Sequence, residues 1–456
     1  MSGLGMAVGG ASTTFRGGRR NNLNIAILGG GIAGLSAGRE LRRRGRGVEI
    51  FERSTEYGGM ARSFRWHGFD CDLGPHRLFC DDPVTLAEIA QRTSLTEHQR
   101  RSRIRMQGRW LREPINGAEV LGKLHPRDSM RIAHGYLRRP DMEGTNFDEV
   151  VHARFGEGLR DVFFRPYAQK LFGVDPTEIS AEWANQKIRV GGLREYIRQN
   201  SRLSSRTFLY PSEGGYGAIV DALYQDVRSC VFTDYTLVRI GFARSGGVIC
   251  VFERSCGSRL IRHFDQVIST LPATVLGRLL GSEPALRFRP VTLHYLLVAQ
   301  EQVTRNHWLY FADGTDRHRI NRVTEFKNFA STPDPRPVTV LCCEVTHSAS
   351  VTTGEVVAEL AGVGLLDAGD VIDTKVVTLA NAYAIHDRST IEELFEFDRF
   401  VAKFPQIHRL GRTSTFAHQD LDEVISGSRL LAEQLSPRRL PAGQLSPRRP
   451  IDLVAA

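Results

Sequence analysis

Residues 23–41, "LNIAILGGGIAGLSAGREL", join a short apolar run to a glycine-rich turn and a helix-like continuation. Residues 25–28 have the composition of a strand buried in a parallel sheet. Three glycines follow in a GxGxxG pattern: Gly29, Gly31 and Gly34. The first permits a tight turn, the second lets the backbone approach a pyrophosphate, and the third lets helix and strand pack closely. The stretch therefore predicts a βαβ unit that holds a dinucleotide at a helix N-terminus.

A second apolar run, "VEIF" at residues 48–51, ends at Glu52. This carboxylate lies about 20 residues beyond the glycines, where the acceptor for a ribose hydroxyl is expected. A carboxylate at this place also repels the 2′-phosphate of NADP. We expect Ala33, inside the glycine pattern, and Arg53, beside the acid, to border the same nucleotide.

A second glycine pair comes soon after the acid and distinguishes FAD from NAD. The pair and the residues after it are Gly58, Gly59, Met60, Ala61 and Arg62. They resemble the "GG-x-x-R/S" segment of the FAD-binding amine-oxidase superfamily. The resemblance implies a second backbone approach to the extended FAD, with Arg62 opposing the charge of the diphosphate.

Composition bounds the remaining possibilities. The chain has 456 residues, which is too long for one core and predicts two or three domains. Its 41% hydrophobic and 24% charged residues are typical of a soluble globular protein, with no apolar run near the roughly 18 residues of a membrane span. Seven cysteines without CxxC spacing favour a reducing cytoplasm and no metal site.

The formal charge of +9 comes largely from arginine runs. No aromatic-interleaved basic patch accompanies them, so we expect no nucleic-acid partner, whereas an anionic small molecule such as a nucleotide sugar suits the charge. The oligomeric state is not predicted.

The expected fold is α/β: a Rossmann-like FAD-binding domain with a helical insertion and an antiparallel-sheet substrate domain. The expected segments are a disordered extension at 1–21, a discontinuous FAD-binding domain at 22–80, 205–280 and 395–435, a mainly helical insertion at 81–204, an antiparallel-sheet domain at 281–394 and a disordered tail at 436–456.

Five further stretches carry a family resemblance over residues 23–435: "GPHRLF", "PYAQKLFG", "SEGGYGAIVDAL", "DQVISTLP" and "GRTSTFAHQDLDEVI". In this order they resemble the UDP-galactopyranose mutase-like and protoporphyrinogen-oxidase-like flavoproteins of the amine-oxidase superfamily. The resemblance implies noncovalent FAD. It adds these residues to the expected FAD site: Gly74, Pro75, His76, Leu237, Val238, Thr270, Gly411, Arg412, Asp420 and Leu421.

The resemblance also implies a substrate site. His76 is the candidate catalytic residue beside the isoalloxazine ring, the alternative being a histidine that only packs. Phe172 is expected to form an apolar wall, and Arg412 with His418 to hold an anionic or polar part of the substrate.

Some positions depart from the mutase pattern. Phe172 stands where true mutases carry tryptophan, and Phe416 and His418 replace the paired tyrosines that hold the substrate diphosphate. Lys187 and Arg189 lie near the sugar-binding arginine without matching its register. UDP-galactose is therefore not expected to be held as in a mutase.

Three functions follow from these observations. The first is an FAD-dependent oxidoreductase that takes a hydride from a small polar or anionic metabolite, such as one of a biosynthetic pathway. The second is a non-redox nucleotide-sugar pyranose/furanose mutase that uses reduced flavin N5. The third is a flavin-binding protein without catalysis.

Overall fold

The computed structural model describes residues 23–113, 115, 117–187, 207–332, 334–346 and 350–436, without the side chains of 186 and 187. The predicted N-terminal extension lies outside the described residues, as does the predicted tail beyond Ser436. So do the Lys187 side chain and Arg189. Among the described residues, no helix has the length and apolar composition of a membrane span.

The glycine-rich stretch lies in a five-stranded parallel sheet with the strand order β19-β13-β1-β2-β9. In chain order its strands are β1 (Asn24–Leu28), β2 (Gly47–Phe51), β9 (Val231–Phe232), β13 (Gln266–Ser269) and β19 (Ile407–Arg409). Segments far apart in the sequence thus share one sheet. Because the strands are parallel, the loops after them meet at the same edge, where doubly wound sheets bind their ligands.

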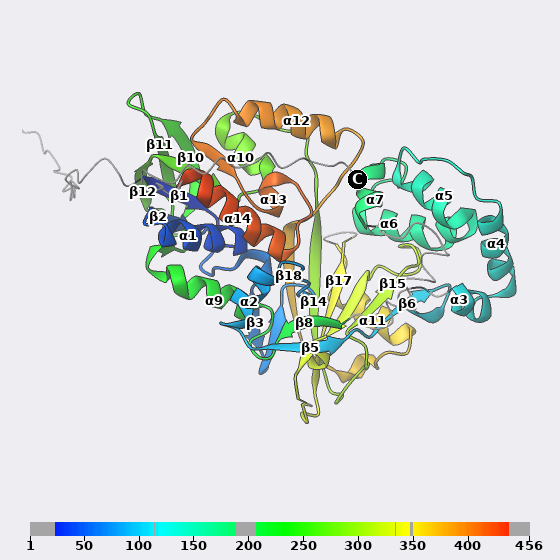
Figure 1. Cartoon of the computed structure of the whole chain (residues 1–456). Coiled ribbons are helices and arrows are strands. Elements are labelled where there is room, and N and C mark those ends of the chain that lie inside the picture. Colours follow the sequence, from blue (N-terminus) through cyan, green and yellow to red (C-terminus); the bar gives the residue numbers. More distant parts are fainter. Residues whose placement is uncertain are drawn as a thin grey trace, which may run out of the picture.

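Side-chain alternation along β1 accounts for the layers on this sheet. Ile25 and Ile27 pack against one helical layer: α1 (Ile32–Arg43), α9 (Gly217–Val227) and α14 (Leu421–Leu435) (Figure 1). Ala26 and Leu28 point to the opposite face, since successive side chains of a strand alternate. That face is covered by β10 (Thr236–Phe242), β11 (Val248–Glu253), β12 (Arg259–Phe264), α10 (Ala273–Leu280) and α12 (Thr390–Val401).

A Gly-Gly turn joins two strands of this layer. Strands β10 and β11 pair antiparallel, and Gly246 and Gly247 between them have φ values of 90° and 87°. Only glycine adopts this conformation readily, so the turn chemistry fixes the connection.

A seven-stranded sheet lies beside the parallel one, with the order β18-β14-β17-β16-β15-β6-β7. Its strands are β6 (Ser102–Met106), β7 (Arg109–Arg112), β14 (Phe288–Val298), β15 (Trp308–Phe311), β16 (Arg322–Glu325), β17 (Thr339–Val345) and β18 (Val371–Ala384). All neighbours pair antiparallel except β15 with β6. The expected antiparallel sheet is therefore present, extended at one edge by β6 and β7, which were not predicted.

Helix α11 (Thr353–Gly362) covers one face of this sheet with apolar contacts to Leu309, Val323 and Cys343. Two smaller sheets complete the strands: β3 (Ser63–Trp66) with β4 (Phe69–Asp72), and β5 (Leu95–Gln99) with β8 (Thr207–Pro211). The segment predicted as mainly helical thus contains three strands that the sequence pattern did not reveal: β5, β6 and β7.

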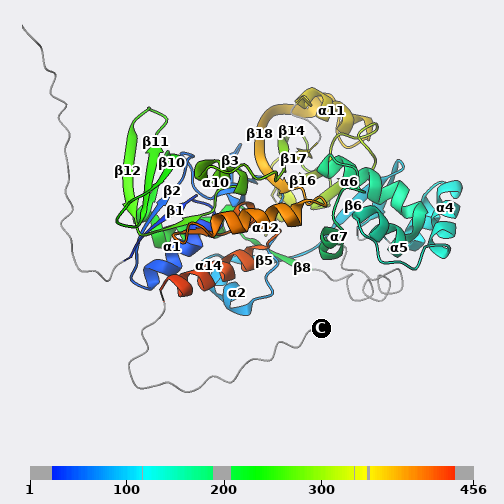
Figure 2. The same cartoon turned by 90° about the horizontal axis from the view of Figure 1, so that it is seen from above.

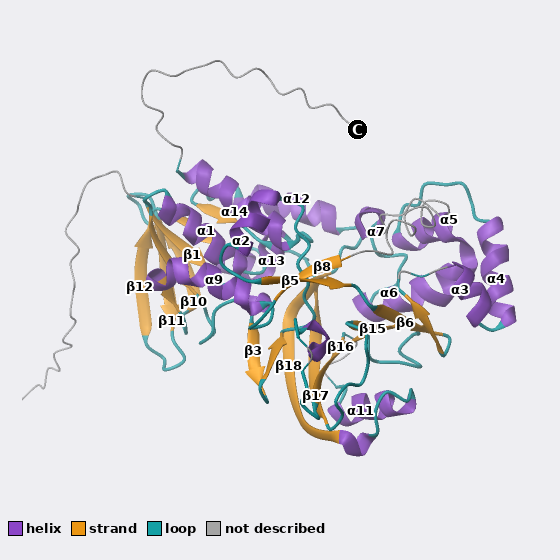
Figure 3. Ribbon diagram, turned by 60° about the horizontal axis from the view of Figure 1, so that its bottom comes forward, coloured by secondary structure: helices purple, strands orange, loops and turns teal. Residues whose placement is uncertain are grey.

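Helices form the far end of the molecule. They are α3 (Gly117–Lys123), α4 (Pro126–Leu137), α5 (Phe147–Leu159), α6 (Arg165–Phe172) and α7 (Ala181–Lys187); α2 (Pro83–Ala90) and α13 (Arg412–Thr415) lie instead beside α14 and α10. Figure 2 shows the seven-stranded sheet between the parallel-sheet unit and this helical end. Figure 3 shows the same separation, with α4 and α5 grouped away from α1 and α14. The fold is α/β, as predicted.

Candidate active site

The three glycines after β1 serve different purposes. Gly29 has a φ of 109°, and a Cβ on Gly34 would lie 2.0 Å from the Gly29 carbonyl oxygen, so the chain itself requires both. Gly31 has an ordinary φ of −79°, and the nearest atom to a Cβ there is 3.8 Å away. The protein therefore has room for a side chain at Gly31. Because Gly31 has no side chain, the start of α1 stays open to a ligand. This is where a pyrophosphate binds in proteins with this motif.

The second glycine pair lies against this turn. The Gly58 amide donates to the Gly30 carbonyl at 2.7 Å, and a Cβ on Gly59 would be 3.3 Å from the Gly31 Cα. Gly58 and Gly59 have φ values of 101° and 58°, which favour glycine. Two glycine backbones thus face each other at the start of α1, as an extended dinucleotide requires.

Residues after this pair hold the second turn in place. Met60 and Ala61 lie in a 3₁₀ turn, Gly59–Ala61. Arg62 donates to the Gly59 carbonyl at 3.0 Å and pairs with Glu56 at 3.2 Å. These contacts tie Arg62 to its own turn, and its expected action on the diphosphate stays a prediction.

Glu52 follows β2 beside the same turn. One carboxylate oxygen accepts from the Gly30 amide at 2.8 Å and the other from the Ser54 amide at 2.9 Å. Arg53 is exposed. The Glu52 carbonyl accepts from Tyr235 N, so the chain leading into β10 runs alongside. Two residues on, Leu237 is partly buried and Val238 is 41% exposed.

Two later segments close around α1. The Thr270 hydroxyl donates to the Leu28 carbonyl at 2.8 Å, and a Cβ on Gly411 would lie 2.8 Å from Ala33 Cβ. Asp420 caps α14, whose first residue Leu421 is 9% exposed. The residues present fit FAD. The turn at residues 29–31 and the turn at residues 58–59 face each other and leave open space at Gly31 for the diphosphate.

His76 lies in a loop fixed by a buried carboxylate. Asp72 accepts from the Ser63 hydroxyl at 2.6 Å, the Tyr210 hydroxyl at 2.9 Å and the Tyr216 amide at 2.8 Å. Burial raises the pKa of Asp72 to about 6. The His76 ring stacks on Tyr216 at 4.8 Å, with Nδ1 3.9 Å from the Asp72 carboxylate.

Gly74 and Pro75 lead into His76. Gly74 has a φ of 83°, and a Cβ there would lie 3.2 Å from the Glu344 carboxylate, so the loop packs closely against the seven-stranded sheet. Burial lowers the pKa of His76 to about 4, and the positive charges of Arg412 and Arg322 add to the decrease. The imidazole is therefore neutral at pH 7.

An arginine–tyrosine cluster faces this loop from the sheet and from α6; it consists of Tyr167, Tyr310, Arg322, Glu344 and Tyr383. Arg322 pairs with Glu344 through two nitrogens, at 2.8 and 3.0 Å, and lies 5.7 Å from the Tyr310 ring. Burial raises the pKa of Tyr383 to about 12, and it also raises the pKa of Tyr167 above its usual value. The phenols of Tyr167 and Tyr383 are thus protonated donors at neutral pH.

Sequence reasoning missed this cluster. Glu344, Arg322 and Tyr310 stand opposite one another on β17, β16 and β15. A charged residue in β16 and another in the apolar run of β17 were the available signal. Tyr167 lies in the quoted stretch "PYAQKLFG", from which only Phe172 was selected.

Phe172 does not join the cluster. Its side chain is 4% exposed and packs edge-on against Trp183 at 4.6 Å, in the core of the helical end. Apolar packing holds it there, and the structure does not support its expected place as a substrate wall.

Arg412 and His418 do come together. A guanidinium nitrogen of Arg412 lies 3.1 Å from His418 Nδ1. Phe416, between them in sequence, is 1% exposed, has a φ of 54° and packs against Phe288. A buried ring explains why phenylalanine stands there.

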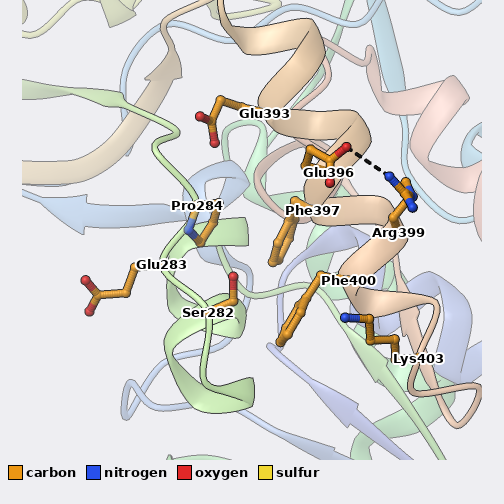
Figure 4. A pocket seen from close by; sticks show the side chains of 9 residues that line it. All are labelled: Ser282, Glu283, Pro284, Glu393, Glu396, Phe397, Arg399, Phe400 and Lys403. Atoms are coloured by element: carbon orange, nitrogen blue, oxygen red, sulfur yellow. Dashed lines mark hydrogen bonds and ion pairs between the residues drawn. The ribbon is translucent and has the colours of Figure 1, made fainter.

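A separate hollow lies on the outer surface between the turn after α10 and helix α12 (Figure 4). Its volume is about 380 Å³, and Phe397 and Phe400 line it together with charged side chains, among which Arg399 pairs with Glu396. It contains no predicted site residue. Within the described ranges, no three histidine, cysteine or carboxylate side chains group as metal ligands.

Comparisons with known proteins agree with this geometry. Residues 32–308, more than half of the chain, match the model of the family "Flavin containing amine oxidoreductase". A protein named "Probable UDP-galactopyranose mutase" from Klebsiella pneumoniae is 25% identical over 168 residues, 35% of this chain and 44% of that protein. Coproporphyrinogen III oxidase from Staphylococcus aureus is 24% identical over 307 residues, 58% and 64% of the two chains.

Both matches span less than two thirds of the relative's length. The crystal structure of a reduced UDP-galactopyranose mutase shares the fold, with a TM-score of 0.77 over 91% of this chain and 94% of that one, at 21% identity. The family match, joined with the paired glycine turns, leads to one conclusion: the chain binds FAD and belongs to the flavin-containing amine oxidoreductase family.

Proposed function

We propose that the protein is an FAD-dependent oxidoreductase that takes a hydride from a small anionic metabolite. The arginine–tyrosine cluster opposite His76 supports this most strongly, because it places cationic and phenolic donors at one site. Bound FAD supplies the two-electron acceptor. The charge of the metabolite follows from Arg322 and Arg412, whose fields both reach His76.

The side chains divide the work between orientation and proton transfer. Tyr167, Tyr310 and Tyr383 orient the substrate through their phenol hydroxyls, which can donate hydrogen bonds. His76 is the candidate acid–base group: it is neutral, and it is held by Tyr216 and the Asp72 network. Nδ1 is buried without a hydrogen-bond partner among the described residues, so the accessible edge of the ring is the one that meets substrate.

A mutase function is the second candidate, favoured by the same cluster. Its arginine and tyrosines can replace the paired tyrosines that are missing at Phe416 and His418, and hold a diphosphate from the sheet side. The shared fold with the reduced mutase fits this alternative but does not distinguish it from an oxidoreductase.

Anaerobic spectroscopy separates the two. Purified FAD-loaded protein is mixed with a panel of anionic metabolites, including nucleotide sugars, while the flavin absorbance is recorded. We expect bleaching by one compound. Turnover that needs prior dithionite reduction and leaves no net bleaching would overturn the oxidoreductase in favour of the mutase. If the bound flavin responds in neither way, the protein is a flavin-binding protein without catalysis.

A further inference from the structure

Arg77, next to His76, is a cation that forms no ion pair with any carboxylate in the described part of the chain. Its guanidinium carbon lies 4.5 Å from the Phe79 ring and 5.6 Å from the Trp308 ring. Across the described residues it forms no ion pair and no hydrogen bond, and its nitrogens are not among the fully buried polar atoms. Burial lowers the pKa of Arg77 below its usual value; the positive charges of Arg100 and Arg322 add to the decrease, and the Glu113 carboxylate opposes it only in part.

Each neighbouring arginine already has a carboxylate partner. Arg100, which also lies over Trp308 at 5.9 Å, pairs with Glu113. Arg322 pairs with Glu344 through Nε and one of its two terminal nitrogens, and its other terminal nitrogen has no hydrogen-bond partner among the described residues. Glu113 additionally accepts from a serine hydroxyl, and it acts on Arg77 as a nearby charge without forming an ion pair with it.

The sheet sets the distance between Arg77 and the arginine–tyrosine cluster. Trp308 and Tyr310 are two residues apart on β15 and point to the same face, because side chains of a strand alternate. Arg77 lies over the first ring and Arg322 over the second. With a rise of about 3.3 Å per residue, the rings are roughly 7 Å apart. One phosphate or carboxylate group between the two guanidinium groups can reach both.

We infer that Arg77 is a specificity-determining residue, which binds an oxyanion group of the substrate together with Arg322. The inference rests on the proposed function and names the group that the substrate must carry: a phosphate or a carboxylate. A guanidinium suits either group, since its planar fork binds two oxygens at once. The aromatic rings under Arg77 hold it in place without neutralising it.

Anion binding to FAD-loaded protein tests this directly. Inorganic phosphate and acetate are titrated in parallel at constant ionic strength, with binding followed by calorimetry and by tryptophan fluorescence, because Trp308 lies under Arg77. We expect one anion to bind and Arg77→Met to weaken it about 10-fold or more, as for loss of a charged hydrogen bond. Arg77→Lys should retain much of the binding. Which anion binds identifies the group.

Arg305→Met is the matched control. Arg305 is exposed, and its loss changes the net charge equally. Equal binding by the wild type, Arg77→Met and Arg305→Met would overturn the inference, as would a wild type that binds neither anion. If Arg77→Met does not retain FAD, Arg77→Gln provides the same comparison.

The two proposals fail differently. A substrate that bleaches the flavin equally well in wild type and Arg77→Met would refute the role of Arg77 alone. An Arg77-dependent anion site in a protein that no substrate bleaches would refute the redox function alone.

Discussion

The cofactor turn and the arginine–tyrosine cluster are built in different ways. The turn uses backbone: glycines at 29, 31 and 34 meet Gly58 and Gly59 within a short length of chain. The cluster uses side chains from α6 and from four strands of one sheet, spread over more than 200 residues. A site built from backbone is determined by the local spacing of residues in the sequence, whereas a site built from side chains depends on strand order and register.

A substitution at Gly31 has the largest expected effect on the backbone-built turn. A Cβ has room there in the protein alone, so we expect Gly31→Val to fold and to lose measurable FAD binding, because the side chain enters the ligand's place. Circular dichroism measures folding, and flavin absorbance after dialysis against FAD measures binding. Gly369→Val, at an exposed glycine with open space, should bind normally.

Gly34→Ala provides the contrast. Its Cβ would meet the Gly29 carbonyl oxygen at 2.0 Å, so the expected result is loss of folding. FAD binding by Gly31→Val would show that this glycine does not mark the cofactor's approach.

His76→Ala probes the junction between the two regions. We expect FAD to stay bound and turnover to fall roughly 100-fold, as for loss of a positioned acid–base group. With a pKa near 4, wild-type His76 is neutral above about pH 5 and protonates only below it. The wild-type rate should therefore show no inflection from His76 between pH 5.5 and 8, and should fall as the pH drops toward 4.

Steady-state kinetics normalised to bound flavin measure the effect, on the substrate that bleaches the flavin. His263→Ala, at an exposed histidine of β12, is the control. Near wild-type turnover in His76→Ala would reduce His76 to a packing role.

Sequence reasoning reached the turn because its rules are local. The strand, the glycine spacing and Glu52 lie within 30 residues, and the structure brings Thr270, Gly411 and Ala33 to the same place. It missed Arg322 and Tyr310, since no local rule shows that β15 and β16 pair with these residues opposite each other.

The same limit explains the placement of Phe172 and the missed strands. A sequence motif specifies which residue stands at a position but not where its side chain points. The Phe172 side chain packs in the core of the helical end. Strands β6 and β7 are rich in arginine, so their pattern resembles a solvated helix until β15 pairs with β6.

Lys170 connects the helical end to the cluster and gives the smallest expected effect. Its side chain is 2% exposed, and its ammonium donates to the carbonyls of Phe311, Asp313, His318 and Ile320 at 2.6–3.3 Å. Phe311 ends β15, and the other three residues lie in the segment that leads to β16. These two strands carry Tyr310 and Arg322 of the arginine–tyrosine cluster. Lys170→Met leaves the carbonyls without their donor, so we expect the free energy of unfolding to fall by about 2 kcal/mol.

Urea unfolding of FAD-loaded protein measures this change, with Lys403→Met as the exposed control. Because Lys170 holds the segment that leads to Arg322, anion affinity should also fall, whereas FAD affinity should not. A loss of FAD affinity equal to the loss of anion affinity would contradict the separation between the two regions. A stable variant with unchanged anion binding would show that the strands position Arg322 without help from the helical end.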